Sequence, residues 1–383
     1  MKKRIFIFVL FFTIVLLFSN ISISTSAKIK DDEDLGFIEG AKSGILMELS
    51  TGEILYKKDI DKRLAPASMT KIMTLLLVFE GIENNVISYD TILTVSKSAE
   101  SMGGSQVYLK ENEKISVDEA IKCVCICSAN DCAVLLAEAI SGSEEAFVRK
   151  MNRKANDMGL KNTLFSDCTG LSSQNHYSSS HDMAIMSKEL IDKYPKVLEY
   201  TNIREDYIRK NTNSPFWLVN TNKLIGRVDG VLGLKTGYCS FSGYNITLLM
   251  KKDNMNLISV VFGYSDSTKR NSESLELLRY GFNTYELKTI LKKDEILETI
   301  ESPCYRYPIN IRVKDDINIL VKKGNKENSS YDYEYNIENN LLSGSISLNF
   351  GARNVTGKIY TDSIIEKRNI LDLLKYSFKR CFC

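Results

Sequence analysis

Histidine is scarce: the chain of 383 residues holds two, His176 and His181, only five positions apart. Imidazole nitrogen is a common ligand of catalytic zinc, so there is little material for a histidine-rich metal centre. A large charge of either sign is also missing, because 50 basic residues nearly balance 48 acidic ones. A net charge of +2 leaves no excess to neutralise a phosphate backbone, which argues against nucleic acid as a partner.

An apolar run long enough to span a bilayer is not found at the N-terminus. Residues 5–18 are almost wholly apolar, but these 14 residues fall short of the span, which needs about 20 residues. A basic start, Met1–Arg4, precedes the run, and the small residues Thr25-Ser26-Ala27 follow it. This order predicts a secretory signal peptide over residues 1–27, with a retained membrane anchor as the alternative. In either case the body of the protein works outside the cytoplasm.

Cysteine is present in an odd number, nine, so at least one thiol is free or paired between chains. Cys123, Cys125 and Cys127 crowd one predicted helix with no histidine near them. Metal binding would need convergent thiolates, so we expect small buried hydrophobic residues instead.

Two segments that are far apart in sequence have the composition of strands. The first is a predicted hairpin, Ser43–Leu49 with Ile54–Lys58, and the second covers residues 231–264. Helical patterns fill most of the interval, including an all-round apolar stretch from Met69 to Phe79 and a helix capped at Ser116. We therefore expect one sheet, completed by distant segments, in a domain over residues 38–287.

The C-terminal third follows a different pattern. Short alternating runs after residue 290 predict a small, β-sandwich-like domain over residues 290–362. Residues 364–383 place basic side chains opposite apolar ones, which favours an amphipathic helix lying on a membrane surface. The alternative is a terminal helix that docks on the β domain.

Ser68-Met69-Thr70-Lys71 is the only Ser-x-x-Lys in the chain, and it opens the predicted buried helix. At a helix start Ser68 and Lys71 are one turn apart on one face, close to the positive helix end. A lysine acts as a base only when it is neutral, a state that burial and a second cation favour. Alone, the motif is equally well a capping serine beside a surface lysine.

Two further tripeptides follow in order. Ser128-Ala129-Asn130 lies in the turn between two apolar helices, 60 residues after Ser68, although Ser-x-Asn also occurs twice elsewhere. Lys235-Thr236-Gly237 ends a predicted strand 107 residues further on. Lysine and threonine there could bind a carboxylate, and a glycine lets a ligand approach the backbone closely.

The ordered set resembles the penicillin-recognising serine enzymes, and most closely the serine-type D-alanyl-D-alanine carboxypeptidases, the low-molecular-mass penicillin-binding proteins. The likeness covers residues 38 to 285. Further stretches that carry it are Ala65–Lys71, Ser128–Asp131, Asp167–Leu171, His176-Tyr177, His181–Ala184 and Gly233–Tyr238. The resemblance implies an α+β fold, an antiparallel sheet flanked by helices, with a small all-β domain and a membrane-binding helix after it.

The resemblance also implies a mechanism without metal or cofactor. Ser68 would attack the carbonyl between two D-alanines of a peptidoglycan stem peptide, and Lys71 would take its proton. Ser128 would relay a proton to the leaving D-alanine. The remaining residues would bind substrate: Asn130, Lys235, Thr236, Gly237 and Tyr238, the N–H groups of Ser68 and Tyr238 forming the oxyanion hole. β-Lactam antibiotics would be inhibitors that acylate the same serine. Cys239 and Ser242 depart from the family pattern, which has threonine and alanine there.

Three other classes compete with this interpretation. A class A β-lactamase needs a glutamate for deacylation, and residues 160–180, where it would fall, contain none. A Ser-His-Asp hydrolase would show a Gly-x-Ser-x-Gly elbow, which the sequence lacks. A non-catalytic wall-binding protein on the same fold should have lost a nucleophile or base, yet all six polar motif residues are present.

Overall fold

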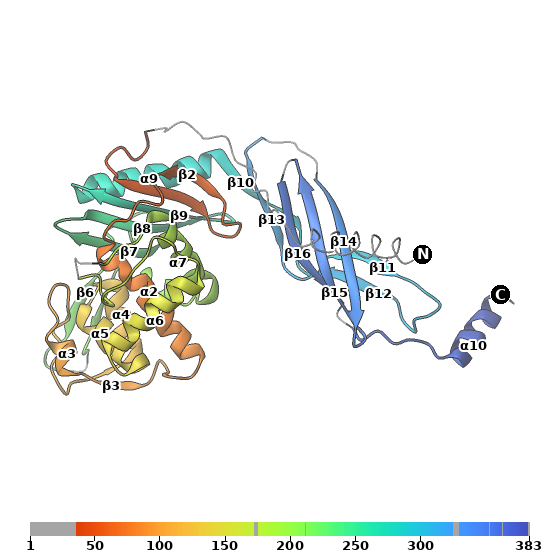
Figure 1. Ribbon diagram of the computed structural model, residues 1–383, viewed down its shortest axis with the longest axis horizontal. Helices are drawn as coiled ribbons and strands as arrows, with labels where there is room; N and C mark the ends of the chain where they lie inside the picture. The colour runs from red at the N-terminus through yellow and green to blue at the C-terminus, as the bar shows by residue number, and fades with distance from the viewer. Residues whose placement is uncertain are drawn as a thin grey trace, which may run out of the picture.

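The computed structural model describes residues 36–171, 175–210, 212–324, 329–351, 353–361 and 363–381. The predicted signal peptide therefore lies outside the described residues. Figure 1 shows two parts, a sheet packed with helices and an elongated β part, with the last helix at the far end of the β part.

One antiparallel sheet of five strands organises the first part. Its strands, in sheet order, are β2 (Ile54–Lys58), β1 (Ser43–Glu48), β9 (Met255–Tyr264), β8 (Gly243–Lys252) and β7 (Val231–Cys239). The N-terminal hairpin pairs with β9 through β1, in a register that sets Leu46 opposite Ser259. Distant segments thus complete one sheet, as the sequence predicts.

Both faces of this sheet are covered, and all six residues of β1 are buried. Helix α9 (Ser267–Thr284) packs on one face against β8 and β9, and α7 (Ser180–Lys193) packs on the other (Figure 1). Each face has its own apolar core. The rest of the helical layer comprises η1 (Ala67–Thr70), α2 (Lys71–Glu83), α3 (Lys97–Glu100), α4 (Val117–Ile126), α5 (Asn130–Ser141), α6 (Glu144–Asp157) and α8 (Val197–Thr201).

Helix α2 runs through the centre of the helical layer, and ten of its 13 residues are buried. This confirms the buried helix expected from its all-round apolar sequence. The capping box is also confirmed, because the Ser116 side chain accepts a hydrogen bond from the Glu119 N–H at 3.2 Å.

Helix α5 begins at Asn130, two residues after Ser128, whose φ of 66° lies in the left-handed region. The terminal helix α10 (Ile370–Cys381) differs from the prediction, because it begins six residues after the predicted Ile364. The preceding segment packs on the β part instead: Ile365 is buried there, and the Arg368 N–H donates to the carbonyl of Cys304.

Two short strand pairs in the first part were not predicted. They are β3 (Ile92–Thr94) with β4 (Lys114–Ser116), and β5 (Glu205–Ile208) with β6 (Phe216–Val219). Their strands have three or four residues, too few for alternation to mark them.

The second part is built of antiparallel strands, in agreement with the expected all-β region. Its strands are β10 (Tyr285–Leu291), β11 (Ile296–Ile300), β12 (Ile309–Val313), β13 (Ile317–Lys322), β14 (Ser329–Glu338), β15 (Leu341–Phe350) and β16 (Arg353–Tyr360). Strand β10 follows α9 directly and pairs with β13. An ion pair of 3.2 Å joins Arg353 to Glu53 of the first part. Among the described helices, none is long and apolar enough to cross a membrane.

Candidate active site

Ser68 lies in η1, the helical turn that leads into α2, and Lys71 is the first residue of α2. The Lys71 Nζ atom lies 3.2 Å from the Ser68 Oγ atom. Lys71 is fully buried, whereas Ser68 is half-buried and open to a reactant. The helical spacing that the sequence suggested therefore brings the candidate nucleophile and the candidate base into contact.

The Lys71 ammonium is held in one place by two further acceptors. It donates to Asn130 Oδ1 at 2.6 Å and to the Thr169 carbonyl at 2.8 Å. Asn130 in turn donates through Nδ2 to the Gly103 carbonyl at 2.7 Å, which fixes its amide orientation. Three acceptors satisfy the three N–H bonds of the lysine, so its nitrogen cannot swing away from Ser68.

Ser128 sits at the junction of α4 and α5 with a positive φ of 66°. Its side chain is buried, yet its Oγ atom has no hydrogen-bond partner within the described part of the chain. A buried hydroxyl without a partner is energetically unfavourable and uncommon. It leaves one donor and acceptor available for a bound molecule.

Strand β7 forms the opposite wall, and Gly237 is where it meets the nucleophile's turn. A Cβ atom at Gly237 would lie 2.5 Å from the Pro66 carbonyl oxygen. The glycine is thus required by close packing of the strand against η1, whereas the sequence suggested close approach of a ligand. Thr236 Oγ1 donates to Thr221 Oγ1 at 2.9 Å. The Tyr238 ring packs at a tilt against the Tyr244 ring, and Tyr238 is 56% exposed.

Two buried lysines give the site unusual electrostatics. Burial lowers the pKa of Lys71 to about 8. Burial, and then the nearby charge of Lys71, lower the pKa of Lys235 to about 7. Because two ammonium groups repel each other in a region of low dielectric constant, the pair readily gives up one proton near neutral pH. A neutral lysine beside Ser68 is therefore accessible.

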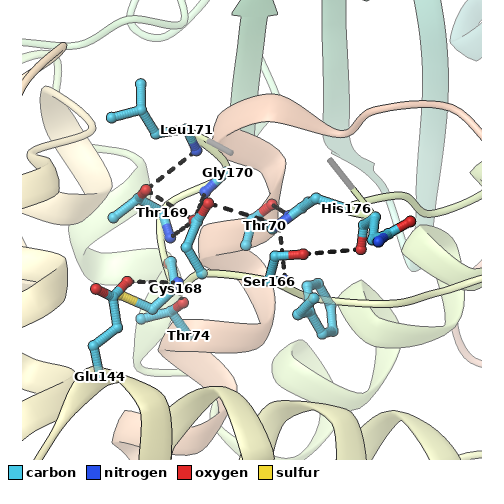
Figure 2. A network of polar contacts seen from close by, with 12 residues as sticks. Thr70, Thr74, Glu144, Ser166, Cys168, Thr169, Gly170, Leu171 and His176 are labelled. Atoms are coloured by element: carbon cyan, nitrogen blue, oxygen red, sulfur yellow. Dashed lines mark hydrogen bonds and ion pairs between the residues drawn. The ribbon is translucent and has the colours of Figure 1, made fainter. Parts of the chain in front are cut away.

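The Thr169 carbonyl is held by a polar network that the sequence did not assign (Figure 2). Asp167 Oδ1 accepts from the N–H groups of Thr169 and Gly170 at 2.7 and 2.6 Å, closing a tight turn. His176 Nδ1 accepts from a backbone N–H, which leaves Nε2 to donate to Thr70 Oγ1 at 2.7 Å. Burial lowers the pKa of His176, so the neutral ring fits this arrangement.

The same network ties the turn to two helices. Thr74 Oγ1 donates to the Cys168 carbonyl at 2.6 Å, and the Cys168 N–H donates to Glu144 at 3.1 Å (Figure 2). The Asp-x-Thr-Gly sequence was visible as a turn signal, because aspartate side chains hydrogen-bond to the backbone that follows them. Its function in orienting a carbonyl toward Lys71 was not visible, because that depends on tertiary contacts.

On the other side of the site, Asp131 positions the loop that carries Gly103. Its buried carboxylate accepts from the N–H groups of Val107 and Leu109 at 3.0 and 3.1 Å. The residue directly after Asn130 thus orders the loop against which Asn130 itself is bonded.

Of the three cysteines expected to be buried in one helix, Cys123 and Cys125 are buried, whereas Cys127 is only partly buried. Seven cysteines are free within the described residues, and Cys123, Cys125, Cys132 and Cys168 are buried in the helical layer. Burial raises the pKa of the Cys125 thiol to about 12. Burial also raises the pKa of the Cys127 thiol, which is next to Ser128. No cluster of metal-ligating side chains is found in the described ranges.

An antiparallel sheet flanked by helices, with a serine and a buried lysine facing a Lys-Thr-Gly strand, defines a serine enzyme of the penicillin-recognising class. The model of the peptidase S11 family, described as D-alanyl-D-alanine carboxypeptidase, matches residues 34–266. The chain therefore belongs to this family, the serine-type D-alanyl-D-alanine carboxypeptidases.

Individual relatives agree with this assignment. The D-alanyl-D-alanine carboxypeptidase DacF of Bacillus subtilis is 46% identical over 289 residues, which cover 75% of this chain and 74% of that protein. The crystal structure of penicillin-binding protein 5 from Haemophilus influenzae is 28% identical with a TM-score of 0.72, covering 85% of this chain and 98% of that one. Penicillin-binding protein D2 of Listeria monocytogenes, solved with ampicillin bound, is 29% identical with a TM-score of 0.57 over 63% of this chain and 98% of that one.

Proposed function

We propose that the enzyme removes the terminal D-alanine from peptidoglycan stem peptides through an acyl-enzyme on Ser68. The observation that carries this proposal is the buried Lys71 nitrogen, held 3.2 Å from the Ser68 hydroxyl by Asn130 and Thr169. A serine hydroxyl needs an adjacent base to become a nucleophile, and Lys71 is the base in contact with it.

Acylation would proceed as follows. Ser68 Oγ attacks the carbonyl carbon between the two D-alanines while neutral Lys71 takes the hydroxyl proton. The oxyanion that forms is stabilised by the N–H groups of Ser68 and Tyr238, which the close contact of Gly237 with η1 keeps near one another. The unpartnered hydroxyl of Ser128 passes its proton to the departing amine as the C–N bond breaks, and it recovers a proton from the protonated Lys71, which becomes neutral again.

Substrate binding would determine which of the two buried lysines, Lys71 or Lys235, loses its proton. The terminal carboxylate binds beside Lys235 and Thr236 and favours the charged form of Lys235. That charge repels a second proton from Lys71, so the base is neutral when substrate is bound. Water then attacks the ester, the Ser68 oxygen recovers its proton, and the shortened peptide leaves.

Release of D-alanine from a diacyl-L-Lys-D-Ala-D-Ala peptide tests the proposal. The enzyme should release one D-alanine per peptide and leave the product ending in a single D-alanine unchanged. No release over hours at micromolar enzyme would contradict it and favour the non-catalytic alternative.

β-Lactams are proposed as inhibitors that form the same ester on Ser68. Rapid turnover of penicillin would instead favour a β-lactamase.

We also propose that the mature chain is exported and lies on the outer face of the cell membrane through α10. Ile370, Leu371 and Leu374 are 77%, 69% and 53% exposed, and isolated apolar side chains at helical spacing suit an interfacial helix. Sedimentation of the chain with phosphatidylglycerol vesicles should fall sharply in a Leu371→Glu, Leu374→Glu variant. Equal sedimentation of both would support a helix that serves another contact.

A further inference from the structure

A small pocket lies beside the β5–β6 hairpin, and none of the predicted site residues lines it. Its volume is about 210 Å³. Pockets that enclose drug-sized ligands measure roughly 300–1,000 Å³, so this one suits a single sugar unit or a small acidic group. The lining residues that carry the argument are Arg204, Trp217, Val219, Lys223, Ile225 and Arg227.

The pocket is rich in positive charge that the protein does not neutralise. The guanidinium groups of Arg204 and Arg227 have no hydrogen-bond or ion-pair partner among the described residues, and the nearby Glu205 pairs with neither. Lys223 donates only to the Asn220 carbonyl, at 3.0 Å. The two unpaired guanidinium groups and the Lys223 ammonium surround one cavity, which favours a carboxylate or phosphate ligand.

One wall of the pocket is apolar and flat. Trp217, the only tryptophan of the chain, is 54% exposed on the outward face of the hairpin, opposite Tyr207 in the register. The neighbouring outward pair is Glu205 with Val219, and both line the pocket beside it. An exposed indole beside cations favours a ligand that has an apolar face as well as an acidic group, rather than a bare anion.

The pocket is connected to the substrate strand by a short segment. Asn220 and Asn222 line it, and Thr221 between them accepts the hydrogen bond from Thr236 Oγ1 at 2.9 Å. Asn222 Nδ2 also approaches the Gly233 carbonyl of β7, at 3.5 Å. A polymer whose terminal carboxylate lies at Thr236 could therefore present another part of itself to this pocket.

We propose that the pocket is a second binding site for the cell-wall polymer, which holds a muramyl peptide. The sugar ring lies against Trp217, and a carboxylate of the attached peptide binds Arg204 and Arg227. This inference rests on the proposed function for the identity of the polymer. It adds a subsite that distinguishes polymer-linked stem peptides from free short peptides.

Binding can be measured without turnover, because the single tryptophan reports on the pocket by its fluorescence. Muramyl dipeptide, which lacks D-Ala-D-Ala, should change the emission saturably, and more weakly at 0.5 M than at 0.05 M salt. The variants Arg204→Gln and Arg227→Gln should each weaken binding about tenfold, as expected for loss of one charge-assisted contact, with thermal unfolding showing that they fold. Arg153→Gln, which changes an exposed arginine on α6, is the matched control and should bind as wild type.

Three outcomes of this titration would overturn the proposal. The first is an unchanged emission up to 10 mM muramyl dipeptide. The second is an equal change with inorganic phosphate at the same concentration, which would make the site one for simple anions. The third is an equal change with N-acetylglucosamine, a neutral sugar that should have little effect, because the arginines would then have no part in binding.

A kinetic comparison separates this inference from the proposed function. The measured quantity is a ratio: the kcat/KM for a muramyl-linked pentapeptide divided by the kcat/KM for diacyl-L-Lys-D-Ala-D-Ala. In Trp217→Ala this ratio should be about tenfold lower than in the wild type, because the KM for the muramyl-linked peptide rises. An unchanged ratio contradicts the subsite and leaves the carboxypeptidase activity intact. Failure of the wild type to cleave either peptide contradicts the proposed function, and the fluorescence titration still decides whether the pocket binds.

Discussion

The ammonium nitrogen of Lys71 lies 3.2 Å from the hydroxyl oxygen of Ser68, one helical turn earlier in the chain. The contact depends on segments that are distant in sequence, because Asn130 and Thr169 hold the lysine in place. Burial lowers the pKa of Lys71 to about 8, so the neutral form is a minor but accessible species at pH 7. The account of catalysis follows from this pair and from the second buried lysine, Lys235.

Replacing Lys71 and Lys235 one at a time should distinguish the function of Lys71 as a base from that of Lys235 as a positive charge that binds substrate. Lys71→Arg keeps a positive charge that cannot be lost, so kcat for D-alanine release should fall by about 10²–10⁴. Lys235→Gln should act mainly through binding, lowering kcat/KM by roughly 10–100-fold, the value of a charge-assisted hydrogen bond. That second loss should vanish when the substrate's terminal carboxylate is amidated. Near wild-type turnover by Lys71→Arg would exclude Lys71 as the base.

The pH profile should report the coupled lysines. Activity requires neutral Lys71 and charged Lys235, whose pKa values burial lowers to about 8 and about 7. We expect kcat/KM to fall on the acid side as Lys71 gains its proton and on the alkaline side as Lys235 loses its own. In Lys235→Gln the repulsion on Lys71 disappears, so its pKa rises and the acid limb moves to higher pH. An acid limb that stays in place or moves to lower pH would contradict this coupling.

Ser128→Ala should affect activity and stability in different ways. The Ser128 hydroxyl is buried without a partner, so its removal should leave the midpoint of thermal unfolding unchanged or slightly raised. Loss of the proton relay should lower kcat by about 10²–10⁴. Ser259→Ala in β9 is the matched control, because it removes another buried, unpartnered hydroxyl. Full kcat in Ser128→Ala would remove Ser128 from the mechanism.

Gly237→Ala tests the packing of β7 against the nucleophile's turn. The added methyl group would lie 2.5 Å from the Pro66 carbonyl oxygen, a contact that backbone movement alone can relieve. We expect a loss of about 1–3 kcal/mol in the free energy of unfolding, typical of overpacking, and a large loss of acylation as the oxyanion hole opens. Gly103→Ala adds a methyl group to open space and should leave the unfolding midpoint unchanged. Equal midpoints for both variants would contradict the close contact.

Much of the fold follows from local pattern. The apolar run of α2, the capping box at Ser116 and the alternating strands after residue 290 each carry a signal within ten or so residues, and the structure contains all three. Elements of three to five residues, such as β5 and β6, have too few side chains for a periodic signal. The start of α10 was predicted too early because the apolar Ile365 packs in the β part rather than on the helix.

The sequence predicted side chains of the candidate site, but it did not predict the backbone groups that hold those side chains in place. Ser68, Lys71 and Asn130 could be singled out because each is a chemically specific residue in an ordered motif. In the structure Lys71 donates hydrogen bonds to both of the others. The Thr169 carbonyl could not be singled out, because every residue has a carbonyl and its direction depends on Asp167. Thr221 was not singled out because it belongs to no motif and only the fold places it against Thr236.

Intact mass after incubation with a penicillin tests the central claim most directly. The wild-type chain should gain the mass of one penicillin, because the ester on Ser68 hydrolyses slowly, and the adduct should be absent in Ser68→Ala. A peptide digest should place the added mass on the segment that contains Ser68. An adduct that persists in Ser68→Ala, or a wild type that neither gains mass nor hydrolyses penicillin, would contradict Ser68 as the nucleophile.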